Sequence, residues 1–266
     1  MKNIRYALRK IALTTTVLFL GSLIASSLRA GEVLEDVVEK RFPLAPSGTF
    51  SLRAIDGTVE IFGTDSPEVK IVAVKKAFSP ERLNAIAIRV DARPDVVNIE
   101  TTPPPAPRHH FLDRSGTVEY TINIPQTARI ARVELPNGNL VIDGMRGASI
   151  AANLGGGQLE THNCFCDQTI HVNQGELNVF FDWMEERPIS IEAGIENGNM
   201  VARLPTDAGF HLRAVAKDGH VSSDFSPMEN RKGDDSEINE VIGDDATAKL
   251  SFRAGEGNIH VSEVIW

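Results

Sequence analysis

The chain lacks most of the features that would assign it a familiar chemistry. Its 266 residues include only two cysteines, two tryptophans and two tyrosines. It carries no phosphate-binding glycine loop, no nucleophile elbow and no helical metalloprotease motif. Basic residues are also in deficit, with 27 Lys and Arg against 36 Asp and Glu and a formal net charge of −9. Because nucleic acid and anionic lipid attract basic proteins, we expect neither as a partner. We also expect no cofactor and no metal, and we predict that the protein is not an enzyme.

The chain also has no apolar run of the roughly 20 residues that a membrane-spanning helix needs. Its most apolar stretch, residues 11–25, follows a basic segment and precedes the small residues Ser26, Ser27 and Ala30. This order is typical of a secretory signal peptide, with a membrane anchor as the alternative. We predict that residues 1–30 are a signal peptide. The mature protein would be exported to the periplasm, cell surface or extracellular space, without a membrane span.

What the chain does have is a repeated glycine frame. An apolar residue stands two positions after each glycine of the frame, and another stands five positions before it. The frame glycines are Gly57, Gly138, Gly157, Gly175, Gly198, Gly219 and Gly257. From Gly138 to Gly219 they recur every 18 to 23 residues. Self-similarity at such a period is typical of a stacked repeat architecture.

The pattern inside each unit indicates strands. Residues 139–142 and 258–261 place apolar side chains two apart, which puts them on one face of a strand and not of a helix. Dipeptides such as Asn137-Gly138 and Asn197-Gly198 predict tight corners, since glycine accepts positive φ. We therefore predict an all-β fold, a right-handed β-solenoid of stacked repeats, with a β-sandwich of hairpins as the alternative.

We expect residues 31–266 to form a single β-repeat domain. Residues 31–129 would supply N-terminal strands near 68–76, 86–91, 96–100 and 117–124, a helical turn near 80–85, and a proline-rich loop over 102–113. Residues 130–266 would hold the regular repeats. An acidic surface loop over 226–247 interrupts them.

The repeats resemble a known bacterial family. Units such as Asn137-Gly138-Asn139-Leu140 and Asn197-Gly198-Asn199-Met200, with the proline-ended segment 120–125 before them, are similar to those of the family called "putative adhesin". Its members are secreted or envelope-associated β-repeat proteins without established catalytic residues. The resemblance implies a β-helix-like solenoid and a surface role.

His162, Cys164 and Cys166 alternate and would share one face of an extended segment. Two cysteines in an exported protein favour a disulfide, although a bridge two residues apart requires a bend at Phe165. Free or intermolecular thiols are one alternative. A metal site completed by His171 is the other, and it is disfavoured because zinc prefers four convergent ligands.

Two acidic residues offer the best candidate catalytic pair. Gln158, Glu160, Glu176 and Asn178 should point away from the core on adjacent repeats. Glu160 and Glu176 could then approach the spacing of a glycosidase acid and base. A polysaccharide-active enzyme is therefore the alternative to a non-enzymatic protein, although no orienting cluster accompanies the pair.

The run over 180–184 is the most apolar segment between repeats. Phe181, Trp183 and Met184 would either close the core or contact a partner. We predict a non-enzymatic surface or envelope component that binds a protein or polysaccharide partner through its rigid face and loops. An envelope-stress or regulatory accessory role is a further alternative, since it too requires only a folded binding surface.

Overall fold

The computed structural model describes most of the chain beyond the predicted signal peptide. The described residues are 32–107, 113–225, 230–232, 235–243 and 246–264. The predicted signal peptide thus lies outside them. Val33–Trp266 form a compact unit, whose described residues are almost entirely β-structure: strands β1 to β17 join in one hydrogen-bonded sheet, beside one short helix. No helix in the described part of the chain is long and apolar enough to cross a membrane.

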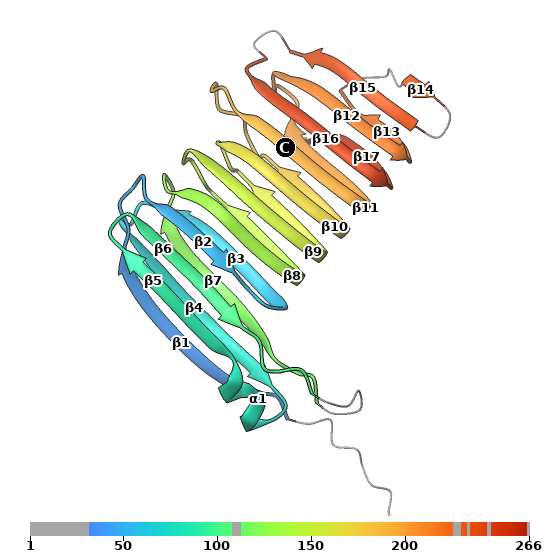
Figure 1. Ribbon diagram of the computed structural model, residues 1–266. Coiled ribbons are helices and arrows are strands. Elements are labelled where there is room, and N and C mark those ends of the chain that lie inside the picture. The colour runs from blue at the N-terminus through green and yellow to red at the C-terminus, as the bar shows by residue number, and fades with distance from the viewer. Residues whose placement is uncertain (1–31, 108–112, 226–229, 233–234, 244–245, 265–266) are drawn as a thin grey trace, which may run out of the picture. The chain divides into compact units, whose positions relative to one another are not determined.

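Four long parallel strands form the centre of this unit (Figure 1). They follow one another in the chain and pair in register, so that Gly138, Gly157, Gly175 and Gly198 lie side by side. The strands are β8 (Arg129–Asp143), β9 (Ser149–His162), β10 (Asp167–Phe180) and β11 (Ser190–Pro205). We call them the central stack. Their lateral match follows from the glycine frame.

The first and last repeats join the two edges of the central stack. At one edge, β2 (Thr49–Arg53) and β3 (Gly57–Thr64) run parallel to β8. At the other, β16 (Ala248–Glu256) and β17 (Ile259–Val264) run parallel to β11. The strands β12 (Phe210–Asp218) and β13 (Val221–Ser223) pair with β16 and β17 from outside. The frame glycines therefore form one row, in the spatial order 57, 138, 157, 175, 198, 257, 219.

Close packing along this row explains the glycines. Gly198 has φ of 140°, and a Cβ there would lie 1.9 Å from the carbonyl oxygen of Gly175. No larger residue fits this spacing or this backbone conformation. The tight corners expected from the Asn-Gly dipeptides are wrong for the central stack. There the glycine bends a strand that continues without interruption, because the neighbouring strands keep both of its sides paired.

The apolar positions of the frame form the core. Every residue two positions after or five positions before a frame glycine is buried, as the sequence predicted. The chain is thus all-β with one mixed sheet. The strands of the central stack are parallel and are not joined as hairpins. The closed right-handed coil of a solenoid stays a prediction.

The N-terminal strands are antiparallel for the most part. β1 (Leu34–Pro43) pairs with β4 (Glu68–Ala77), β4 pairs with β7 (Thr117–Pro125), and β5 (Ala87–Arg93) pairs with β6 (Val96–Thr102). The helix α1 (Pro80–Ala85) begins after Ser79, whose hydroxyl accepts a hydrogen bond from the Arg82 N–H. These elements lie close to the segments predicted from sequence.

The acidic segment 226–247 is not simply a loop. Its described residues include β14 (Asn230–Lys232) and β15 (Asp235–Ile242), and β15 runs antiparallel to β12. Alternation places Ile238 in the core beside the buried Ser236. The density of acidic side chains concealed this strand pattern, and the prediction of a loop is wrong over β14 and β15.

Candidate functional site

The predicted outward positions of β9 and β10 do lie on one face of the sheet. Gln158 lies beside Glu176 and Glu160 lies beside Asn178, while Leu159 and Leu177 between them are buried. Glu160 and Glu176 are therefore diagonal neighbours on adjacent strands and do not face each other directly. The two-residue period of a strand correctly predicted that these four side chains point away from the core.

A surface hollow of about 490 Å³ opens on this face across β9, β10 and β11. We call it the outer hollow. Its lining combines two carboxylates, three amides, one guanidinium and two apolar side chains. The residues are Gln158, Glu160, Glu176, Asn178, Phe180, Asn199, Val201 and Arg203.

Asn178 lies at the bottom of the outer hollow. It is only 8% exposed, yet its amide forms no hydrogen bond with any other described side chain or backbone group. The neighbouring Asn199 differs, because its Oδ1 accepts hydrogen bonds from the backbone N–H and the amide of Asn258, at 3.1 and 3.2 Å. Among the described residues, the buried side-chain polar atoms without a partner belong to Asp113, Thr161 and Gln168, so the amide atoms of Asn178 remain open to solvent at the hollow.

Arg203 borders the same hollow. Its guanidinium lies over the ring of Phe180, 4.7 Å from the centroid. Within the described residues it forms no ion pair, so its N–H donors face the hollow unpaired. Sequence reasoning missed both residues. The signal was present, because Asn178 stands three positions after Gly175 and Arg203 stands five positions after Gly198, and odd offsets from a frame glycine point outward on these adjacent strands.

A second candidate region lies on the segments that join the strands of the central stack. We call residues 144–148, 163–166 and 181–189 the link side. Of the three predicted contact residues there, Phe181 is buried at 1% exposure and Met184 packs partly against the core. Trp183 is 47% exposed, and its ring lies 5.5 Å from that of Phe165. Only Trp183 thus offers a large apolar surface to a partner.

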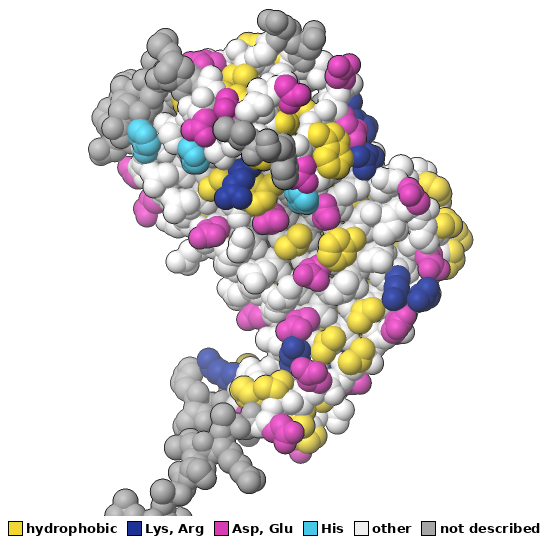
Figure 2. Space-filling model, turned by 180° about the vertical axis from the view of Figure 1, so that it is seen from behind, with side chains coloured by type: hydrophobic (Ala, Val, Ile, Leu, Met, Phe, Trp, Pro, Cys, Tyr) yellow, Lys and Arg dark blue, Asp and Glu magenta, His cyan; other side chains and the backbone are white. Residues whose placement is uncertain are grey.

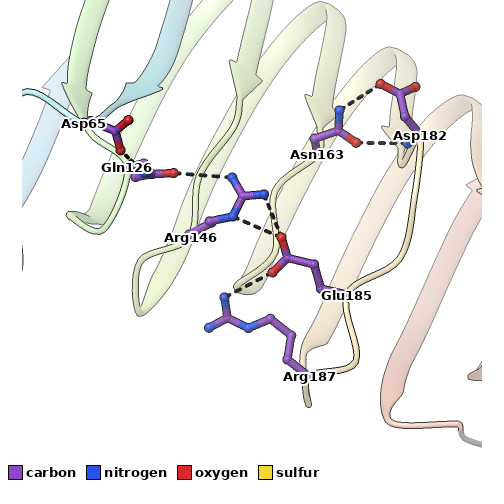
Figure 3. A network of polar contacts seen from close by, with 7 residues as sticks. All are labelled: Asp65, Gln126, Arg146, Asn163, Asp182, Glu185 and Arg187. Atoms are coloured by element: carbon purple, nitrogen blue, oxygen red, sulfur yellow. Dashed lines mark hydrogen bonds and ion pairs between the residues drawn. The ribbon is translucent and has the colours of Figure 1, made fainter.

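A polar network holds the link side in place (Figure 3). Arg146 donates two hydrogen bonds to Oε1 of Glu185, at 3.1 and 2.6 Å, and a third to Gln126. Gln126 in turn bonds to Asp65. The segment that carries Trp183 is therefore tied to two earlier links of the chain.

Asn163 fixes the start of the same segment. Its amide accepts from the backbone N–H of Asp182 and donates to the Asp182 carboxylate, both at 2.9 Å. Asn163 is 7% exposed and has φ of 48°, a left-handed conformation that asparagine tolerates better than most residues. His162 lies between two carboxylates, 3.2 Å from Asp143 and 2.9 Å from Asp182.

Both cysteines are free thiols in the structure, whereas the sequence favoured a bond between them. The Cys164 thiol points into the core and donates to the carbonyl oxygens of Ile142 and His162. Burial raises the pKa of the Cys164 thiol well above its usual range, and it raises the pKa of Cys166 to about 12. His162 bonds to carboxylates, and no group of three or more His, Cys, Asp or Glu residues in the described ranges could hold a metal.

The base of the proline-rich loop lines another hollow, of about 420 Å³. Pro103, Pro104 and Pro107 form one wall of it. Arg82 anchors the loop by donating to the carbonyl oxygens of Ser115 and Pro105. Arg82 is thus used to hold the loop, and much of the remaining lining is proline and other apolar residues. Residues 108–112 of the predicted proline-rich loop lie outside the described part.

The surface seen in Figure 2 carries acidic side chains across the whole face, with hydrophobic groups in small separated patches. This distribution agrees with the acidic composition.

No protein-family model matches the chain, and no curated protein matches it in sequence. Solved structures do match. A "putative cell adhesion protein" from Clostridium sporogenes ATCC 15579 has 14% identity and a TM-score of 0.53, covering 88% of this chain and 100% of its own. A "putative adhesin" from Bacteroides fragilis NCTC 9343 has 10% identity and a TM-score of 0.31, covering 86% and 97%. A "putative lipid binding protein" from Parabacteroides distasonis ATCC 8503 has 8% identity and a TM-score of 0.25, covering 87% and 97%. The first similarity shows a shared fold.

Proposed function

We propose that this chain is an exported, non-enzymatic β-repeat protein that presents a binding surface at the cell envelope or cell surface, as an adhesin does. The partner would be a protein or a polysaccharide. Support comes from the fold shared with the "putative cell adhesion protein" of Clostridium sporogenes and from the signal-like residues 1–30. The stack, which we take to be a right-handed solenoid, would serve as the rigid support.

The observation that carries the proposal is the exposed Trp183 on its fixed support. Its ring rests beside Phe165, and the Arg146–Glu185 contacts hold the segment that follows it. Tryptophan is prominent among the residues that dominate binding energy at protein interfaces. A side chain already held in place loses little conformational freedom on binding, which favours affinity.

The test is binding of the purified protein to immobilised envelope polysaccharides and surface proteins. Trp183→Ala should weaken binding at least tenfold, since a central aromatic anchor contributes about 2 kcal/mol or more. Phe78→Ala is the matched control, because Phe78 is an aromatic side chain 55% exposed elsewhere on the unit. Equal binding by wild type and Trp183→Ala would remove this residue from the interface.

Export is part of the proposal. Intact-mass analysis of the envelope or secreted fraction should find a mature chain that begins between residues 25 and 31. A chain still starting near Met1 would contradict cleavage.

A second function is favoured by one observation, which is that Glu160 and Glu176 line the same hollow. A polysaccharide-active enzyme would use them as acid and base. Release of reducing ends by wild type, lost in the Glu160→Gln, Glu176→Gln double variant, would establish this alternative. Under our proposal neither protein releases sugar.

A further inference from the structure

The outer hollow differs from the rest of the polar surface in how few of its side chains are paired. Gln158, Glu160, Glu176, Asn178 and Arg203 form no side-chain hydrogen bond or ion pair within the described residues. From the edge of the hollow onward along the same face, amides and hydroxyls do pair, as in Asn199 with Asn258 and Ser222 with His260. Neighbouring polar side chains on this face can therefore pair, and these five of the outer hollow do not pair with any described residue.

Asn178 is the clearest polar group that the fold leaves available at the hollow. Most of this side chain is buried, but its amide atoms stay open to solvent and no described group bonds to them. An amide held in this way offers both a donor and an acceptor to a ligand in the hollow. Strand propensity does not explain this asparagine, since asparagine is depleted in strands and Val201 occupies the equivalent position on the next strand.

Arg203 supplies a second group prepared for binding. The Phe180 ring beneath the guanidinium restricts its orientation, which lowers the entropy lost when a ligand is bound. The planar guanidinium then offers several N–H donors on one side of the hollow. The carboxylates of Glu160 and Glu176 offer acceptors on the other strands.

This set of groups matches a sugar. Each sugar hydroxyl both donates and accepts, so it can bond to a carboxylate, an amide and a guanidinium at once. The C–H surface of a pyranose can contact Val201, and the volume lies within the range of small-molecule sites. Two carboxylates against one guanidinium disfavour an anionic sugar.

We propose that the outer hollow binds a unit of a neutral glycan, with Asn178 and Arg203 as its principal hydrogen-bonding groups and Phe180 as the residue that positions Arg203. The inference rests on the proposed function, because it takes the chain to bind without cleaving, and it names the ligand class of a site separate from Trp183.

The experiment is calorimetric titration of the purified protein with neutral tetrasaccharides (cellotetraose, mannotetraose and xylotetraose) and with tetragalacturonate as the anionic comparison. At least one neutral tetrasaccharide should bind, with a Kd between micromolar and millimolar. Asn178→Ala and Arg203→Ala should each weaken this binding at least tenfold while the thermal melt stays within a few degrees of wild type. Arg253→Ala, which removes an exposed arginine from β16, should leave it unchanged.

Several results would overturn the proposal. They are binding of no neutral tetrasaccharide at millimolar concentration, preference for tetragalacturonate, or sugar binding that survives both substitutions. Trp183→Ala keeps the two proposals apart, since it should leave tetrasaccharide binding intact. Partner binding that depends on Trp183, without any tetrasaccharide binding, would refute this inference and leave the proposed function standing.

Discussion

Two arginines of this protein lie over phenylalanine rings, and their surroundings differ. Arg146 lies 5.2 Å from the Phe165 ring centroid on the link side, and its guanidinium is bonded to Glu185 and Gln126. Arg203 lies 4.7 Å from the Phe180 centroid in the outer hollow, without an ion pair in the described part of the chain. The two arginines make similar contacts with a phenylalanine ring, but among the described residues only Arg146 also has polar partners.

This difference separates polar groups that stabilise the fold from polar groups that remain available to a ligand. On the link side the Arg146 guanidinium, the Asn163 amide and the Asp182 N–H are matched to acceptors of the same chain, so the network orders a segment without secondary structure. In the outer hollow the strands already order the backbone, and the side chains contribute nothing to that order. Polar groups that the fold does not use remain available to a ligand.

The largest expected effect comes from the row of frame glycines, because the strands that support both arginine–phenylalanine contacts depend on it. Gly198→Val places a β-branched side chain at φ 140° and against the carbonyl oxygen of Gly175. We expect a loss of about 3 kcal/mol or more in the free energy of unfolding, or no folded protein at all. Urea denaturation measures it.

Asn199→Val is the control for Gly198→Val. It removes only the exposed hydrogen bonds to Asn258 and should cost about 1 kcal/mol or less. Equal shifts for the two variants would mean that the glycine row does not set the fold.

The cysteines test how closed the link side is, because they flank Phe165. Burial raises the pKa of both thiols, so the thiolate that reacts with iodoacetamide is scarce at pH 8. We expect no alkylation in the native protein and two additions per chain after denaturation, counted by mass spectrometry. Rapid native labelling, or a mass lower by two hydrogens from a disulfide, would contradict the buried free thiols.

A direct comparison of the two arginine–phenylalanine contacts gives a smaller effect on stability. Arg146→Ala leaves Glu185 without its main partner, and we expect a loss of about 1–2 kcal/mol, limited by partial solvent exposure. Arg203→Ala removes the same stacking contact without breaking an ion pair and should change stability by about 0.5 kcal/mol or less. Similar losses of stability in the two variants would remove the distinction between the two arginine–phenylalanine contacts.

The sequence predicted the strand class, the core and the glycine row, because these depend on local periodicity and on a residue that only one geometry tolerates. It did not predict that Gly257 lies between Gly198 and Gly219. After β12 and β13 the chain forms β15 against β12 and then returns as β16, which pairs with both β11 and β12. Local sequence patterns do not show in which spatial order strands from distant parts of the chain pair.

The site was predictable only in part, for a similar reason. Alternation along one strand placed Glu160 and Glu176 outward, but the unpaired state of Asn178 and Arg203 emerges only when three strands lie in register. Phe181 and Trp183 were not distinguished, since outside a strand no period tells which ring is buried. The cysteines stayed free because Cys164 points inward toward backbone carbonyls.

The smallest expected effect contrasts two buried asparagines. Asn163 and Asn178 are exposed to almost the same degree, 7% and 8%, but only Asn163 has hydrogen-bond partners. Asn178→Val removes an unpaired amide and introduces a residue that suits a strand, matching Val201 beside it. We therefore expect an unchanged or higher stability, by up to about 1 kcal/mol, measured by urea denaturation.

Asn163→Gly is the matched control, because glycine tolerates φ of 48° and the substitution removes mainly the bonds to Asp182. It should cost about 1–3 kcal/mol. A large loss for Asn178→Val would mean that Asn178 already has a partner within the fold, and the outer hollow would then be structural. A gain in stability together with loss of tetrasaccharide binding is what a site kept for a ligand predicts, since selection for binding tolerates a residue that the fold alone would replace.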